Sequence, residues 1–276
     1  MTEQNTQPPR RRKPPPVFHR ATVAEASKPT PRTRRITLSG DDLASYPNEG
    51  PATHFKLVLP DPGRTEVPLP VHGPDGLEWP DGRPTMRTYT PRQVDNAGRR
   101  LVVEFALHPD GGPATAWAES AAPGDPVVVT GGRGAYRIDP EAGYTVLAAD
   151  ETALPAVATI LEDAPEGARV LLFAEVADAG EHLRFGTAAD LSTTWLHHGS
   201  AGTGAGEAAA AAVRDAAFPD GGPGRFWVGL EAGAMRTVRR HLIGDRGMPK
   251  DSIYTRAYWK YGASNHPDGD RGEDVG

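Results

Sequence analysis

The pattern of the chain changes near residue 140, and this change limits the possible folds more than any other feature. Over residues 17–139, short apolar runs alternate with Gly and Pro turns, which is typical of a small antiparallel barrel or sandwich. After residue 143, β runs alternate with helical stretches, which indicates a parallel sheet with crossover helices. We therefore predict a β plus α/β protein, with an N-terminal antiparallel β-barrel domain and a C-terminal α/β domain.

A chain of 276 residues is long enough for two domains with separate cores. The turn-rich sequence at 139–143 is the expected joint, so we predict domains over 17–139 and 140–262. We expect the basic, Pro-rich segment 1–16 and the acidic segment 263–276 to be disordered tails. The expected strands are 18–25, 34–39, 53–59, 85–90, 100–107, 126–130, 144–149, 168–175 and 226–229; the expected helices are 152–162, 208–212 (after a flexible loop over 199–206) and 232–243.

The composition excludes several kinds of chemistry. The chain has no cysteine, which excludes disulfides, thiolate metal sites, iron–sulfur clusters and cysteine nucleophiles. Redox chemistry would therefore need an organic cofactor. No apolar run approaches the roughly 18 residues of a membrane span, and no apolar export segment follows Met1, so we expect a cytoplasmic protein without membrane insertion. We interpret the basic head as a solvated tail and not as a nucleic-acid site.

The sequence Arg-Thr-Tyr-Thr at 87–90 has the side chains that a strand needs to hold a flavin. Because side chains alternate along a strand, Arg87 and Tyr89 should share one face, and Thr88 and Thr90 the other. Arg87 can bind phosphate oxygens, Tyr89 can contact an isoalloxazine ring, and Thr90 can hydrogen-bond the ring edge. The same four residues would also suit an exposed strand with polar side chains.

A Gly-rich turn follows the next β run and opens an apparent helix, in the sequence HPDGGPATAWA at 108–118. The free amides and the dipole at such a helix start suit a pyrophosphate, and the Thr115 hydroxyl can add a hydrogen bond. The alternative is an ordinary turn in which Thr115 caps the helix. A second glycine-rich turn at 131–136 carries Arg133, and it would equally suit a hairpin bend.

In the second half, Asp150, Glu151 and Thr152 lie where a strand turns into a helix. Open α/β sheets bind ligands outside the carboxyl ends of their strands, so these residues are placed to meet a nucleotide. The Gly-x-Gly-x-x-Gly pattern of ordinary Rossmann dehydrogenases is missing. Glu175, at the end of the next strand, would bond a ribose diol and repel a 2′-phosphate, which favours NADH over NADPH; a solvated Glu is the alternative.

Taken in order, these segments resemble the siderophore-interacting protein family, the flavin-dependent ferric-siderophore reductases of the ferredoxin-reductase-like superfamily. The matching segments are 31–40 (PRTRRITLSG), 54–60 (HFKLVLP), 87–92 (RTYTPR), 108–118 (HPDGGPATAWA), 131–136 (GGRGAY), 146–161 (VLAADETALPAVATIL), 227–242 (WVGLEAGAMRTVRRHL) and 258–262 (YWKYG). The chain departs from the family at Gly131-Gly132, where Gly-Pro is common, and at Leu230, where a small residue is more usual.

The resemblance implies an FAD-binding barrel, an NAD(P)H-binding α/β domain and FAD in the cleft between them. It implies that Tyr89 and Thr90 lie nearest the reacting ring, and that cofactor-binding residues are Arg87, Thr88, Tyr89, Thr90, His108, Gly112, Pro113, Ala114, Thr115, Asp150, Glu151, Thr152, Glu231 and Ala232, beside the Glu175 inferred above. It also implies a basic rim of Lys56, Arg133 and Lys260 for an anionic ferric siderophore, although each would equally serve as a solvated surface charge.

We therefore expect a monomeric enzyme that passes electrons from NAD(P)H through FAD to chelated Fe(III). Flavin suits this task because it accepts two electrons together and releases them singly. The siderophore supplies the hard oxygen ligands of the iron, so no protein ligand is needed, and we interpret His197 and His198 as loop or surface residues. The alternatives are a flavin or ferredoxin-type reductase that serves a protein partner, and a siderophore-binding protein without turnover.

Overall fold

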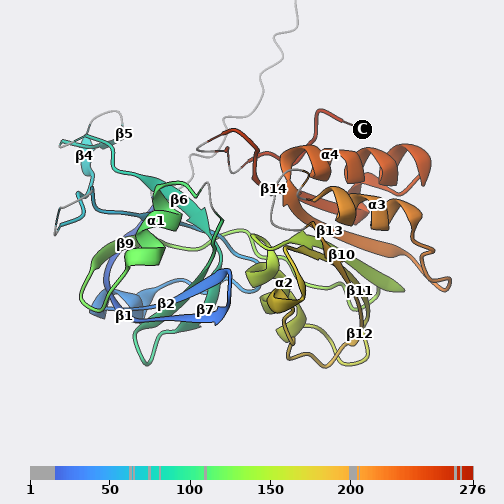
Figure 1. The fold of residues 1–276 in the computed structure, drawn as a ribbon, viewed down its shortest axis with the longest axis horizontal. Helices are drawn as coiled ribbons and strands as arrows, with labels where there is room; N and C mark the ends of the chain where they lie inside the picture. The colour runs from blue at the N-terminus through green and yellow to red at the C-terminus, as the bar shows by residue number, and fades with distance from the viewer. Residues whose placement is uncertain are drawn as a thin grey trace, which may run out of the picture.

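The structure is a computed structural model that describes residues 16–61, 64, 66–73, 76–80, 82–108, 111–198, 204, 206–263, 266–267 and 269–275. Figure 1 shows a mostly β half, coloured blue to green, beside a sheet flanked by helices, coloured yellow to red. All of the expected tail at 1–16 except Pro16, and most of the expected loop at 199–206, lie outside the described residues. No helix among the described residues is long and apolar enough to cross a lipid bilayer.

The N-terminal half is built on one seven-stranded antiparallel sheet in the order β6-β3-β9-β1-β2-β8-β7, which confirms the predicted β architecture. Its strands are β1 (Phe18–Thr30), β2 (Thr33–Ser39), β3 (Phe55–Val58), β6 (Met86–Tyr89), β7 (Pro91–Asp95), β8 (Arg100–Ala106) and β9 (Pro126–Thr130). A separate hairpin consists of β4 (Val71–Gly73) and β5 (Gly76–Glu78). The turn η1 (Asp41–Ser45) and helix α1 (Pro113–Ser120) complete this half.

The two edges of the seven-stranded sheet are joined by a single residue. Strand β6 is one edge and β7 the other, and Thr90 is the residue between them in the chain. A sheet whose opposite edges are covalent neighbours must curl, so a partly open barrel results although β6 and β7 are not paired in the sheet. The predicted flavin strand therefore lies where the barrel closes.

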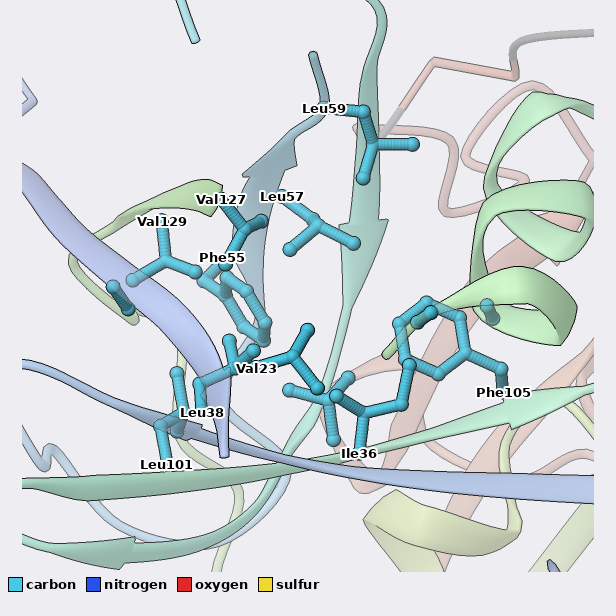
Figure 2. Close-up of a cluster of buried hydrophobic side chains, with 14 of the residues drawn as sticks. Val23, Ile36, Leu38, Phe55, Leu57, Leu59, Leu101, Phe105, Val127 and Val129 are labelled. Carbon is cyan, nitrogen blue, oxygen red and sulfur yellow. The ribbon is translucent and has the colours of Figure 1, made fainter. Parts of the chain in front are cut away.

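Alternating apolar side chains fill the inside of this barrel. Figure 2 shows side chains from β1, β2, β3, β8 and β9 pointing toward one another, among them Ile36, Leu57 and Phe105. Helix α1 packs on the same cluster through Ala114 and Ala118. Because α1 packs on the barrel core, its N-terminus is held at a fixed place relative to β6.

The C-terminal half contains a five-stranded parallel sheet in the order β12-β11-β10-β13-β14, as the alternating pattern predicted. The strand order reverses between β10 and β13, which is the topological switch point of an open α/β sheet. The elements are β10 (Tyr144–Asp150), α2 (Leu154–Glu162), β11 (Arg169–Val176), η2 (Ala179–Glu181), β12 (Asp190–His197), α3 (Glu207–Asp215), β13 (Gly224–Glu231), α4 (Ala232–Arg240), η3 (His241–Asp245), η4 (Lys250–Ser252) and β14 (Ile253–Trp259).

Five strands of the structure were not expected from the sequence. Strands β7, β12 and β14 carry many polar side chains and lie at sheet edges, where only part of each side chain is covered, so their apolar pattern is weak. Strands β4 and β5 were also missed, because each is only three residues long. The Ala-rich helix was correctly expected, because α3 includes Ala208–Ala212.

The C-terminal segment also differs from the expected disordered tail in its described residues. Asp270 accepts a hydrogen bond from Arg236 of α4 at 2.8 Å, and its carbonyl accepts one from the Ala257 amide at 3.0 Å. The Thr255 hydroxyl donates to the Arg271 carbonyl at 2.6 Å. The acidic charge of this segment therefore contacts α4 and its backbone contacts β14, which composition alone does not reveal.

Candidate functional site

Arg87 lies in a small pocket that is rich in positive charge. The pocket has a volume of about 250 Å³ and is lined by Lys56, Arg83 and Arg87, together with the segment between Arg83 and Arg87. Lys56 donates to the Thr88 hydroxyl at 2.7 Å, as expected for directly paired residues on β3 and β6. Three cationic side chains around one pocket favour an anionic group such as a phosphate or a carboxylate. The sequence analysis missed Arg83, because it precedes the strand and belongs to no recognisable motif.

Tyr89 is anchored to the barrel by aromatic packing. Its ring centroid lies 4.4 Å from that of Phe105, and Phe105 lies 5.8 Å from Trp117 of α1. Burial raises the pKa of the Tyr89 phenol, so this group is neutral at physiological pH. The three rings connect β6, β8 and α1, and they place the predicted ring-binding residue on the same part of the barrel as the predicted pyrophosphate turn.

Helix α1 begins at Gly112, and Pro113 occupies its first turn. Among the residues that the structure describes, no side chain caps this helix start. Thr115 does not serve as the cap that the alternative interpretation required, because it lies inside α1, three residues after Gly112, and makes no capping hydrogen bond to a described residue. Within the described part of the chain the first amides of α1 have no side-chain acceptor, and Ala114 and Thr115 are buried. His108 is exposed before the turn.

These groups fit two parts of FAD by their chemistry. The first amides of α1 and the cationic pocket beside β6 suit the oxygens of the pyrophosphate, and the Tyr89 ring offers an aromatic surface to the flavin ring. The fit rests on the start of α1, which no described side chain caps, and on the cluster of cations beside β6.

Thr90 connects the flavin strand to the other half of the molecule. It is buried, and it hydrogen-bonds the Tyr258 side chain of β14. A second contact joins the Ala52 amide to the Thr159 hydroxyl of α2 at 2.9 Å. The edge of the barrel that carries the predicted flavin residues therefore faces the α/β half.

On the α/β side, Asp150 is only 1% exposed at the carboxyl end of β10. One of its oxygens accepts from the amide and hydroxyl of Thr152, and the other accepts from the Trp259 indole at 3.0 Å. Burial, with a smaller contribution from the neighbouring Glu151 carboxylate, raises the pKa of Asp150 to about 7. The carboxyl group is thus poised between its neutral and charged forms near physiological pH.

Glu151 is half-buried and pairs with His198, whose Nε2 lies 3.0 Å from the nearer carboxylate oxygen. His198 lies in the loop directly after β12, as one part of its interpretation expected, although its side chain is buried and not on the surface. His197 is exposed as expected, and its Nε2 lies 2.8 Å from that of His182. His197 is the last residue of β12, and His198 follows it in the loop beside Glu151.

Glu175 occupies the end of β11 but has 0% exposure. Its two oxygens accept the Gly206 and Ala209 amides at 2.8 Å each, which holds the start of α3. Burial raises the pKa of this carboxyl group, and the two amide hydrogen bonds oppose that effect. The alternative interpretation of Glu175 as a solvated surface residue is therefore wrong. Its carboxylate accepts hydrogen bonds at the N-terminus of α3.

Glu231 has a similar capping role on α4, but it stands at the switch-point edge of the sheet. Its side chain accepts the Gly233 and Ala234 amides, and its other oxygen accepts the Tyr261 amide at 3.2 Å. Ala232 is buried beside it. The segment after β14 is thereby tied to the start of α4.

Gly229 keeps the switch point closely packed. A Cβ there would lie within 2.9 Å of the side chains of Trp227, Tyr258 and Ala153. A larger residue would push these side chains apart, so the position requires glycine for close approach. The predicted small-residue turn in this segment thus packs against Tyr258, the residue that contacts the flavin strand.

The three predicted rim residues come from different parts of the fold. Lys56 lines the cationic pocket beside β6, as described above. Arg133 is exposed, and its backbone pairs with His54 next to β3. Lys260 is exposed and directly follows β14, two residues after Tyr258. The barrel half thus carries Lys56 and Arg133, and the α/β half carries Lys260.

An antiparallel barrel set beside a parallel sheet with a switch point has the fold of the ferredoxin-reductase-like class. Two family models match the chain and divide it at the same joint. Residues 22–136 match the siderophore-interacting FAD-binding domain, and residues 142–262 match the siderophore-interacting protein model. This chain belongs to the siderophore-interacting protein family.

Individual relatives agree with this assignment. The ferric vibriobactin reductase ViuB of Vibrio cholerae is 28% identical over 83% of this chain and 84% of its own length. The NADPH-dependent ferric-chelate reductase of Escherichia coli is 36% identical over 52% of this chain and 56% of its own. The crystal structure of a siderophore utilization protein from T. fusca has 35% identity and a TM-score of 0.81, and covers 93% of this chain and 97% of that one.

Proposed function

We propose that this protein is an FAD-dependent reductase that uses NAD(P)H to reduce the Fe(III) of a ferric siderophore and so to release Fe(II). The observation that carries the proposal is the Thr90–Tyr258 hydrogen bond, which joins the predicted flavin strand to the carboxyl end of the parallel sheet. The names of the Vibrio and Escherichia relatives support the same reaction class.

In this proposal, Arg87 and the amides at the start of α1 hold the phosphates of FAD, while Tyr89 and Thr90 position its ring. FAD, when bound, supplies the exchange between a two-electron donor and a one-electron acceptor. The buried Asp150 keeps the β10–α2 turn in shape through Thr152, and Glu231 does the same for the start of α4. These two turns form the nicotinamide side of the site.

The ferric siderophore is the substrate, and its iron keeps the oxygen ligands of the chelate. Lys56, Arg133 and Lys260, together with Arg83, would attract an anionic chelate to the place where the two halves meet. Hard oxygen ligands bind Fe(II) less well than Fe(III), so reduction itself releases the metal. Reduced nicotinamide cofactors are abundant in the cytoplasm, and we place the reaction there, in a monomeric enzyme.

In this proposal, both NADH and NADPH can serve as the electron donor. The expected preference for NADH depended on a Glu175 carboxylate able to repel a 2′-phosphate. That carboxylate is buried and bonded to two amides, so it offers no free charge to the ribose. We propose that the protein accepts NAD(P)H without discrimination by Glu175, a view that suits the NADPH-dependent Escherichia relative.

The test starts with the absorbance spectrum of the purified protein, which should show bound flavin. Anaerobic addition of NADH and of NADPH should bleach it, and a ferric catecholate or hydroxamate chelate should restore the colour while a ferrous-specific dye reports Fe(II). A flavin that no nicotinamide bleaches would exclude a reductase and leave a siderophore-binding protein. A flavin that bleaches but ignores every ferric chelate would favour a reductase that serves a protein partner.

A further inference from the structure

We propose that Glu181 is a positioning residue that fixes the barrel against the α/β half, so that the flavin and nicotinamide sites meet in one geometry. The inference rests on the proposed function, which needs two rings bound by different halves of the chain to approach each other. Glu181 lies far along the chain from the flavin strand, in the turn η2 between β11 and β12.

The Glu181 carboxylate is bonded by donors from the barrel. One oxygen accepts the Arg32 amide at 2.8 Å, and the other accepts the Thr30 hydroxyl at 2.5 Å and the Thr33 hydroxyl at 3.5 Å. These donors belong to the tip of the β1–β2 hairpin, 148 to 151 residues earlier in the chain. Glu181 is 5% exposed and Thr30 is 8% exposed, so the contact is closed to solvent.

The turn that presents Glu181 is itself shaped to meet the hairpin. Asp178 accepts the Gly180 amide at 2.8 Å, which fixes the turn just before Glu181. A Cβ on Gly180 would lie 3.6 Å from the Pro31 ring, so the backbone of the turn packs directly against the hairpin tip. Pro31 restricts the hairpin backbone at the same place. Both sides of the contact are therefore preformed.

A buried carboxylate without hydrogen-bond donors is strongly unfavourable. Because the donors to Glu181 come from the other half, rotation or separation of the halves would leave this charge unsatisfied. The exposed Arg92–Glu162 ion pair also joins the halves, but water can replace it when the halves move. Glu181 should therefore select one relative placement, whereas Glu162 should only add a weak attraction.

This placement matters because hydride transfer requires the two reacting atoms to approach within about 3–3.5 Å, and a misplacement of about 1 Å can cost roughly 100-fold in rate. Cofactor binding by the barrel alone does not depend on the placement. Loss of Glu181 should therefore slow the step that spans both halves and leave FAD affinity unchanged.

The first measurement needs no cofactor. Hydrogen–deuterium exchange of the apoprotein should show faster exchange in peptides that contain the Arg32 amide in Glu181→Ala, by roughly tenfold or more, while Glu181→Gln and the control Glu162→Ala resemble the wild type. The Gln side chain can accept the Arg32 amide with its oxygen and donate to the Thr30 hydroxyl, so it should restore the contact. Unchanged exchange in Glu181→Ala would overturn the inference.

The second measurement separates the two half-reactions in anaerobic stopped flow. In Glu181→Ala, flavin reduction at saturating NAD(P)H should slow by roughly tenfold or more, with FAD and nicotinamide dissociation constants within about twofold of the wild type. Reduction of a ferric chelate by the dithionite-reduced variant should be unchanged. Wild-type rates in Glu181→Ala, or a parallel loss of FAD affinity, would overturn the inference.

A second variant and the wild-type control complete the test. If Glu181→Ala does not fold, Thr30→Val removes one donor from the same contact and should give a smaller slowing of flavin reduction in the same direction; wild-type behaviour would again overturn the inference. If NAD(P)H fails to bleach even the wild type, both the proposed function and the inference fail. If the wild type bleaches and Glu181→Ala bleaches equally fast, the inference fails alone.

Discussion

Trp259 and Asp150 are joined by a hydrogen bond that crosses a strand, with the indole Nε1 donating to the buried carboxyl group at 3.0 Å. Asp150 ends β10 and Trp259 ends β14, and β13 lies between these strands in the sheet. The bond therefore ties together the carboxyl ends on both sides of the switch point. It also explains how β14, whose sequence has a weak strand pattern, becomes part of the candidate nicotinamide site.

The elevated pKa of Asp150 predicts a pH-dependent stability. The folded-state pKa of about 7 exceeds the ordinary value of 3.8, so the folded state binds more protons between these values. The free energy of unfolding should therefore fall as pH rises from about 4 to 7, by at most about 1.4 kcal/mol per pH unit. Urea unfolding of wild type and Asp150→Asn across this range measures it. A slope that persists unchanged in Asp150→Asn would refute the assignment.

Arg87→Ala should weaken FAD binding. Loss of a charge-assisted hydrogen bond costs about 1.5–3 kcal/mol, which corresponds to roughly 10- to 150-fold in the dissociation constant. Titration of apoprotein with FAD, followed by flavin fluorescence, measures the effect. Arg100→Ala removes an exposed arginine from β8 and should bind FAD normally. Equal weakening in both variants would indicate a general charge effect in place of a phosphate contact.

Lys260→Ala should mainly raise the KM for an anionic ferric chelate, because the exposed ammonium group attracts the substrate without touching the flavin strand. We expect roughly a threefold to tenfold increase at low salt that shrinks at high salt, since screening removes long-range attraction. Steady-state kinetics at two ionic strengths measures it. Tyr89→Ala is the contrasting variant, because it should lower FAD retention; similar FAD loss in both would count against the two roles.

Glu175→Gln should destabilise the α/β half by about 1–3 kcal/mol, because an amide nitrogen would replace one of the two acceptors at the start of α3. The ratio of NADH to NADPH efficiency should stay within about twofold of the wild type, since the carboxylate is not free to meet the ribose. Thermal unfolding measures the loss of stability, and steady-state kinetics with NADH and with NADPH measure the ratio of efficiencies. A shift of this ratio toward NADPH would restore Glu175 as a donor-selecting residue.

The flavin strand shows how much of the site was readable in the sequence. The order Arg87, Thr88, Tyr89, Thr90 and the glycines before α1 mark local geometry, because alternation along a strand and an uncapped helix start depend on neighbouring residues. Glu175 shows the opposite case. Its partners, Gly206 and Ala209, are 31 and 34 residues away, and nothing near Glu175 in the sequence indicates that they will occupy its oxygens.

The sequence by itself determined the two-part architecture, the strand that carries the candidate flavin residues and the family, since these follow from short-range patterns and from the order of the motifs. Tertiary structure alone decided that Thr90 meets Tyr258, that Asp150 meets Trp259 and that Glu181 is held by the β1–β2 hairpin. The physical reason is that a buried polar group is satisfied by whichever donor the fold brings near, and such donors come from distant parts of the chain.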